Sequence, residues 1–114
     1  MYAEVPPTLF HLTTVTAWTD AQQHGEYRAP SLDTEGFIHL SLERQWRLTA
    51  ARFFRGQSNL VLLELNPHKL TAPVRFEAAD GDSFPHLYGA LNLDAVPTAR
   101  PLSVSSDGTV HEPT

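Results

Sequence analysis

The strongest constraint on the fold of this chain is an almost unbroken apolar run, LVLLEL, at residues 60–65. The run has the length of a strand, and it lacks the polar alternation that marks a strand with one solvated face. Strands that are buried on both faces show this continuous pattern. The run therefore predicts a central strand of a sheet.

Four further strands are expected from shorter apolar or alternating patterns, over residues 8–13, 36–41, 73–78 and 95–104. Residues 84–89 are also apolar and aromatic. Pro85 lies within them and has no backbone N–H to donate, so this stretch is expected to be an irregular or edge segment.

Two helices are expected. The first spans residues 15–24, with Thr14 or Thr16 capping its start. The second spans residues 42–55, where apolar side chains recur at helical spacing and Ser41 is placed to act as the cap. Together the patterns predict an α+β fold: a compact mixed, mostly antiparallel sheet of five or six strands with two helices.

The 114 residues contain no cysteine, 13 Asp and Glu, and 8 Lys and Arg, which gives a net charge of −5. This length suits one domain, expected over residues 1–102, followed by a flexible polar C-terminal tail over residues 103–114. The lack of cysteine excludes a thiol nucleophile and a thiolate metal site. The acidic balance argues against nucleic acid as a partner, because neutralising phosphates requires lysine and arginine.

The chain has no run of about 18 apolar residues, and its first residues lack the basic and apolar segments of a signal peptide. The expected location is therefore the cytoplasm, without membrane contact. The sequence carries no clear oligomerisation signal, so a monomer or a weak homodimer is expected.

Three of the six histidines lie in apolar, strand-like settings: His11 in LFHLT, His39 in FIHLS and His86 in FPHLYG. Each is expected to be partly buried, and burial favours the neutral imidazole. Neutral rings can position a ribose hydroxyl, orient an amide or act as a general base. The alternative is a core histidine whose nitrogens are bonded by the backbone. The other three histidines are assigned no role.

Two hydroxyl residues follow these histidines at the same spacing. Thr13 and Ser41 lie two residues after His11 and His39, on the same strand faces, and are candidate ligand contacts. Both also suit the start of a helix, where a hydroxyl caps free N–H groups. Capping and ligand contact can coexist at a helix start.

Four further candidate ligand contacts lie in a loop and beside the third histidine. The loop offers Tyr27, Arg28 and Ser31. The planar guanidinium of Arg28 suits a phosphate or a carboxylate, and the alternative is a solvated loop charge. Tyr88, beside His86, offers an aromatic face for a flat ring or caps the edge of the sheet.

A histidine-ligated metal site is a separate possibility, because histidines from three segments can bind zinc. The sequence has no His-x-His and no His-x-x-x-His pair, so no metal is expected. It also has no Gly-x-Ser-x-Gly elbow and no glycine-rich phosphate loop, which argues against a serine hydrolase and a P-loop enzyme.

The segments LFHLT, GEYRAPSLDTEGFIHLS, ARFFRG, LVLLEL and FPHLYGALNLDAV resemble the bacterial family known as domain of unknown function 952. That family is similar to the ADP-ribosyltransferase fold, especially its RNA 2′-phosphotransferase branch, in which a His-Leu-Ser strand precedes a helix and a Val/Leu-rich strand. The resemblance implies that His11 contacts the ribose beside nicotinamide and that His39 holds nicotinamide or its ribose. The implied ligand is NAD, used as a substrate.

Two features depart from that pattern. No glutamate matches the late-strand catalytic residue of many transferases; the segment there offers His86 and Tyr88, and Glu77 is the nearest alternative. The chain also lacks an obvious set of arginines for holding RNA phosphate.

The resemblance therefore implies an NAD- or ADP-ribose-using enzyme with His39, His11 and His86 as the catalytic candidates. A non-catalytic domain for a nucleotide or another small ligand is the alternative. A histidine-ligated metal enzyme is the second alternative. In the first two cases the expected partner is a small nucleotide-like molecule.

Overall fold

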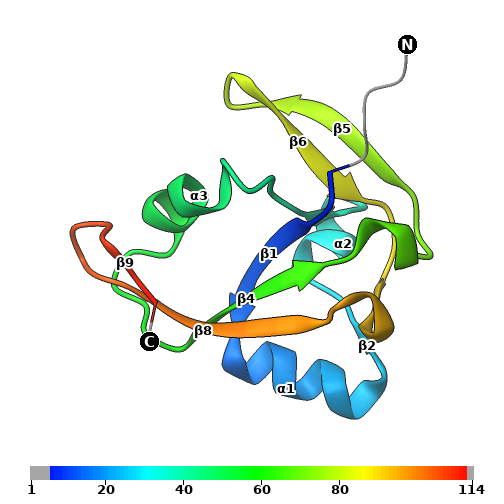
Figure 1. The fold of residues 1–114 in the computed structure, drawn as a ribbon, viewed down its shortest axis with the longest axis horizontal. Coiled ribbons are helices and arrows are strands. Elements are labelled where there is room, and N and C mark those ends of the chain that lie inside the picture. Colours follow the sequence, from blue (N-terminus) through cyan, green and yellow to red (C-terminus); the bar gives the residue numbers. More distant parts are fainter. Residues whose placement is uncertain (1–5, 113–114) are drawn as a thin grey trace.

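The computed structural model describes residues 6–112, and the apolar run forms its central strand (Figure 1). This strand, β4 (Leu60–Leu65), lies between β1 (Leu9–Thr14) and β8 (Thr98–Val104), and both pairs are antiparallel. A short strand, β9 (Val110–His111), pairs with the other side of β8. The prediction of a central strand from the LVLLEL pattern is confirmed.

The side chains of β4 contribute to two hydrophobic clusters, one on each face of the sheet. Its odd-numbered residues pack in a cluster against which α1 (Val15–His24) lies. Its even-numbered residues Leu60 and Leu62 pack in the other cluster, together with Trp46 of α3 (Trp46–Phe53). Successive residues of a strand point to opposite faces, so an uninterrupted apolar run serves both clusters.

The first helix agrees with the sequence prediction at both ends. α1 spans Val15–His24, and the Thr14 hydroxyl accepts a hydrogen bond from the Ala17 N–H at 3.0 Å. Gly25 ends the helix with a φ of 86°, a left-handed conformation that costs glycine little because it has no Cβ.

The second predicted helix is shorter than expected, and its cap differs. α3 begins at Trp46, because residues 42–45 form a turn instead of a first helical turn. Ser41 does not cap it. The N-cap residue, Gln45, makes no side-chain capping hydrogen bond. Its side-chain oxygen instead accepts a hydrogen bond from the Leu42 N–H at 2.9 Å, within the turn that precedes the helix.

A third helix, α2 (Pro30–Thr34), lies in the stretch expected to be a loop, so the predicted number of two helices is wrong. Pro30 stands at its first position, where the fixed φ of proline suits a helix and its missing N–H costs nothing. None of the helices in residues 6–112 has the length and apolar character needed to cross a membrane.

A second sheet has the strand order β3 (Ile38–His39), β6 (Asp82–Leu87) and β5 (Val74–Ala79). β6 is the middle strand, so the prediction of an irregular or edge segment around Pro85 is wrong. Pro85 fits here because its carbonyl still accepts a hydrogen bond from the Leu40 N–H at 3.0 Å, just past the end of β3. Its ring therefore removes a single donor from the ladder.

A third sheet pairs β2 (Glu26–Tyr27) with β7 (Leu91–Asn92). Short 3-10 turns at Pro67–Lys69 and Leu93–Ala95 complete the described elements. The strands thus form three antiparallel sheets in the described part of the chain, where the patterns predicted a single mixed sheet. Hydrophobic patterns show which side chains face a core, and they leave open which strands pair.

The two larger sheets meet at Phe10 and Ser41. The Phe10 N–H donates to the Ser41 carbonyl at 2.8 Å, and the Ser41 N–H donates to the Phe10 carbonyl at 2.7 Å. This pair sets β1 beside the residues that follow β3. Two of the strands that carry the predicted histidines are therefore neighbours.

The flexible tail was expected over residues 103–114, of which 113 and 114 lie outside the described residues. Residues 103–112 contain the end of β8 and the strand β9. Val104 is buried, and Val110 packs against the cluster that contains Trp46. The last described residues thus add to the second hydrophobic cluster.

Removing a side chain from the centre of β4 is expected to cost much of the stability. Leu62 is fully buried, and Leu62→Ala is expected to lower the free energy of unfolding by about 2–5 kcal/mol, because the cavity adds to the lost burial. Leu48 is 68% exposed, and Leu48→Ala is expected to change it by less than about 0.5 kcal/mol. Urea unfolding measures both, and equal effects of the two substitutions would contradict this description of the core.

Candidate functional site

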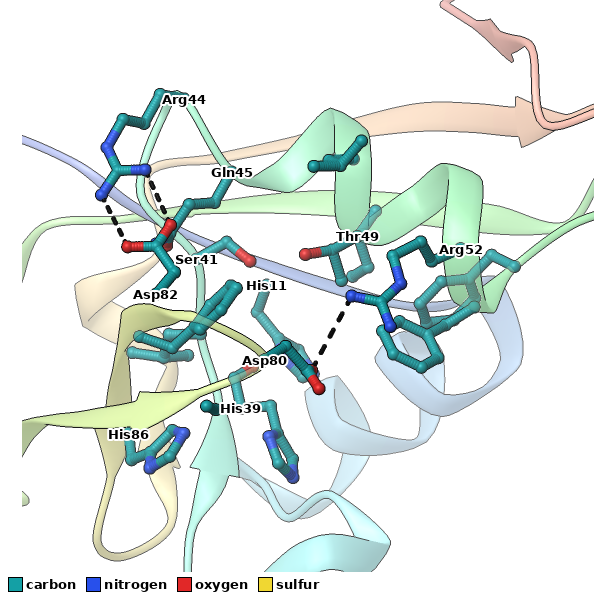
Figure 2. Close-up of a pocket in the computed structure, with 17 residues that line it drawn as sticks. His11, His39, Ser41, Arg44, Gln45, Thr49, Arg52, Asp80, Asp82 and His86 are labelled. Carbon is teal, nitrogen blue, oxygen red and sulfur yellow. Dashed lines mark hydrogen bonds and ion pairs between the residues drawn. The ribbon is translucent and has the colours of Figure 1, made fainter.

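An open cavity of ≈ 450 Å³ lies between α3, the β5–β6 hairpin and the junction of the two larger sheets (Figure 2). Its apolar lining comes from three directions: Leu48 and Phe53 of α3, Phe84 of β6, and Leu12 and Leu40 at the junction. Both side chains from α3 are largely exposed to solvent. A concave, mostly apolar cavity of this size is typical of small-molecule sites.

The polar part of the cavity brings together the three histidines identified in the sequence. His11 on β1, His39 on β3 and His86 on β6 all line it. In the antiparallel pairing of β3 and β6, His39 lies opposite His86, and their ring centroids are 5.4 Å apart. Strand pairing thus gathers residues from distant parts of the chain into one pocket.

The ring of His11 is bonded at both nitrogens. Nδ1 lies 2.7 Å from the His39 carbonyl oxygen, and Nε2 lies 2.8 Å from the Tyr27 hydroxyl. Burial lowers the pKa of His11 to about 4, so the ring is neutral near pH 7. A carbonyl can only accept, so Nδ1 carries the proton and donates to it, and Nε2 accepts from Tyr27.

The hydrogen bonds of His11 continue through Tyr27 to Thr13, which lies on the same strand as His11. The Tyr27 hydroxyl is also 3.0 Å from the Thr13 hydroxyl, and burial raises the pKa of Tyr27. Thr13, Tyr27 and His11 thus form a buried chain of hydrogen bonds that ties β1 to β2 and to the backbone of β3. His11 is thus a buried histidine with one nitrogen bonded by the backbone and the other by a side-chain hydroxyl, which agrees in part with the core-histidine alternative.

His86 is bonded on one side only. Its Nδ1 lies 2.8 Å from Glu77 Oε1, which also accepts a hydrogen bond from the Tyr88 hydroxyl at 2.5 Å. The hydrogen bond from Tyr88 is the main reason that the pKa of Glu77 lies below its usual value, and the bond from His86 is the second reason. The bond between Tyr88 and Glu77 also raises the pKa of Tyr88. His86 Nε2 is buried, and it has no hydrogen-bond partner among the described residues.

His39 is the exposed member of the three. Its Nε2 lies 2.9 Å from Glu35 Oε2, and its side chain is 54% exposed. Phe37 packs against both histidines: its ring stacks on His86 at a centroid distance of 4.0 Å and meets the edge of His39 at 4.9 Å. The half-exposed ring of His39 is therefore accessible to a ligand entering from solvent.

Of the other predicted ligand contacts, one lines the cavity and the rest lie outside its lining. Ser41 is buried and lines the cavity, whereas Tyr88 lies beside His86 and bonds to Glu77. Ser31 donates to the Phe37 carbonyl at 2.7 Å, and Arg28 lies 3.7 Å from Glu26. Neither Ser31 nor Arg28 belongs to the residues that line the cavity.

The rim of the cavity contains charged groups that sequence reasoning missed. Arg44 forms two bonds to Asp82, at 2.8 and 3.0 Å, and these bonds hold the pKa of Asp82 far below its usual value. The buried side chain of Gln45 donates to the same carboxylate at 3.0 Å. Together they attach the β5–β6 hairpin to the turn before α3. No local pattern could relate these residues, because Gln45 and Asp82 are 37 positions apart.

A second ion pair spans the mouth of the cavity. Figure 2 shows Arg52 reaching from α3 toward Asp80 at the tip of the hairpin, and their charged atoms are 3.9 Å apart. Both side chains are about half exposed, so this pair adds little to stability. Arg52 is therefore a cation that an anionic ligand could bind at small cost.

Within residues 6–112, no three histidine or carboxylate side chains gather in an arrangement that could hold a metal ion. The three histidines differ in their partners: His11 contacts a hydroxyl and a carbonyl, while His39 and His86 contact separate carboxylates.

The fold and the site define a small α+β protein with antiparallel sheets and a histidine-lined pocket at the junction of two of them. The family described as "Protein of unknown function (DUF952)" matches residues 12–99, and the chain belongs to this family.

Solved structures of protein CC0527 from Caulobacter crescentus are similar to this chain. Its crystal structure is 34% identical with a TM-score of 0.82, and the alignment covers 91% of this chain and 93% of that one. Its solution NMR structure is 35% identical with a TM-score of 0.76 and covers 90% of each chain. No curated protein matches the chain. The shared fold therefore extends over nearly the whole chain.

Acid is expected to destabilise the protein through His11. Its pKa is about 4 in the folded state and about 6.5 when exposed, so the unfolded state binds the proton first as the pH falls. The free energy of unfolding is expected to be highest above about pH 6.5 and to fall by roughly 3 kcal/mol as the pH drops to about 4. Urea unfolding at a series of pH values measures this slope.

Two substitutions separate His11 from the other titrating groups. His11→Gln removes the buried imidazole and is expected to flatten the slope, whereas His68→Gln, in an exposed turn, should preserve it. Glu77 and Asp82 have lowered pKa values, so their loss of stabilisation begins near about pH 4.5 and overlaps only the lower end of this window. A slope that persists in His11→Gln would contradict the assignment.

Proposed function

We propose that the cavity binds NAD or ADP-ribose and that the protein catalyses a reaction of the ADP-ribosyl-transfer type. The observation that carries this proposal is the convergence of His11, His39 and His86 on one apolar cavity. The resemblance of the His-Leu-Ser strand and the following helix and strand to the ADP-ribosyltransferase fold supports the choice of ligand.

The lining of the cavity suits the parts of such a ligand. Leu48, Phe53 and Phe84 offer apolar surface for a flat ring. Ser41 and Thr49 line the same cavity and offer hydroxyls for ribose. Arg52 is the cation best placed for a phosphate, because its contact with Asp80 is long and exposed. The net charge of −5 favours a small anionic ligand over a polynucleotide.

A non-catalytic binding domain for the same ligand is the second candidate. It is favoured by one observation: both ring nitrogens of His11 are already engaged within the protein. In that case His11 shapes the pocket, and His39 supplies the contact to ligand.

Ligand binding is expected to depend on His39. Isothermal titration calorimetry with NAD, ADP-ribose and nicotinamide is expected to show binding of at least one of them. His39→Ala is expected to weaken that affinity by about tenfold, because it removes an exposed polar contact worth about 1.5 kcal/mol. His68→Ala is the matched control, a histidine in an exposed turn that should leave the affinity unchanged.

The two candidates differ in turnover. Nicotinamide released from bound NAD, followed by chromatography, identifies an enzyme, whereas binding without release identifies a binding domain. Absence of binding by all three compounds would contradict both candidates.

A further inference from the structure

His86 differs from the other two histidines of the cavity in how its two nitrogens are used. Nδ1 is held at 2.8 Å by a carboxylate, and Nε2 is buried with no partner among the described residues. His11, by contrast, has partners at both nitrogens. A buried acceptor without a partner costs stability, so such an atom calls for an explanation.

The surroundings of His86 fix its orientation. Phe37 stacks on its ring with an interplanar angle of 16°, and the ring of His39 meets it nearly edge-on at 76°. Only 7% of its side chain is exposed. The ring therefore has little freedom to turn, and its free nitrogen keeps one direction.

Glu77 determines which nitrogen is free. A carboxylate accepts hydrogen bonds and cannot donate them, so Nδ1 of the neutral ring must carry the proton. The lone pair is then left on Nε2. A carboxylate that orients an imidazole and stabilises its protonated form is the arrangement found in acid–base catalysis. Tyr88 donates to the same carboxylate oxygen and helps to hold it in place.

We propose that His86 Nε2 is the general base of this cavity and that Glu77 is its positioning residue. The proposal rests on the proposed function for the identity of the ligand, and it adds the acceptor class: an alcohol or water.

The proposed reaction transfers the ribosyl group from nicotinamide to the acceptor oxygen. The oxygen of the acceptor forms a bond to C1 of the ribose, the bond from C1 to the nicotinamide nitrogen breaks, and neutral nicotinamide leaves with that electron pair. The acceptor O–H proton moves to His86 Nε2, and the resulting imidazolium is held by Glu77. No oxidant or reductant takes part.

Several titratable or charged groups lie around this ring or around its neighbour His39. Those from the strands packed against it, with the neighbouring residues, are Arg75, Glu77, His39, Glu35 and Tyr88. Glu77 and Glu35 form a matched pair of carboxylates, since each lies within 3 Å of one histidine. The two glutamates can therefore be exchanged for glutamine one at a time.

The first arm of the test uses the ligand-free protein. Histidine side-chain ¹⁵N NMR is expected to show His86 protonated at Nδ1 and unprotonated at Nε2 near neutral pH. Glu77→Gln keeps the size of the side chain and removes its charge, and an amide can donate as well as accept, so the proton of His86 is expected to be shared between Nδ1 and Nε2. Glu35→Gln, the matched control, is expected to leave the proton of His86 on Nδ1. A proton on Nε2 in the unaltered protein, or an unchanged proton position in Glu77→Gln, would overturn the proposal.

The second arm measures nicotinamide release from NAD. Glu77→Gln is expected to lower kcat by about 10²-fold with KM nearly unchanged, and to move the acidic limb of the pH–rate profile to lower pH. Glu112 follows β9 in the other sheet and pairs with Arg47 and Arg100, so Glu112→Gln is the control for loss of a paired carboxylate away from the cavity. A purely structural role of Glu77 would lower thermal stability without moving the pH–rate profile, and that result would overturn the proposal.

The two arms separate this proposal from the proposed function. If the NMR arm gives the expected result and NAD does not bind, the ligand is wrong and the assignment of the free nitrogen stands. If NAD is turned over and Glu77→Gln behaves like the unaltered protein, the ligand stands and the base is wrong.

Discussion

Two backbone hydrogen bonds between Phe10 and Ser41 hold the two larger sheets of this protein together. Both residues are buried, so separating the strands there would leave N–H and carbonyl groups without partners. Each such group costs about 1–3 kcal/mol, which makes the junction hard to open. The cavity lies against this junction, and its histidines come from strands on both sides of it. The geometry of the site therefore depends on this short contact between backbones, together with the hydrogen bond from His11 to the His39 carbonyl.

The junction gives three imidazoles of the same covalent structure three different environments. His11 is buried with two neutral partners, His39 is half exposed beside a carboxylate, and His86 is buried with a carboxylate on one side only. Burial disfavours the charged ring, whereas a neighbouring carboxylate favours it. The division of roles within the pocket follows from these environments: His11 supports the structure, His39 meets solvent, and His86 keeps a free nitrogen.

Local patterns predicted the elements whose causes are local. The helix over residues 15–24 was predicted at both ends, because its cap at Thr14 and its stop at Gly25 lie within a few residues of it. The strand around Pro85 was misjudged, because its central position depends on a partner strand distant in sequence. The same reasoning found the three histidines of the site but missed Gln45 and Asp82, whose contact spans 37 residues.

The sequence by itself determined the doubly buried strand over residues 60–65 and the apolar settings of His11, His39 and His86. Both features follow from the side chains of a few neighbouring residues, because their polarity determines which of them are buried on folding. The tertiary structure alone decided which imidazole nitrogen has a partner and which has none. Tyr27, Glu77 and the His39 carbonyl reach those nitrogens through strand pairing and register, and register depends on contacts between distant segments that no local pattern records.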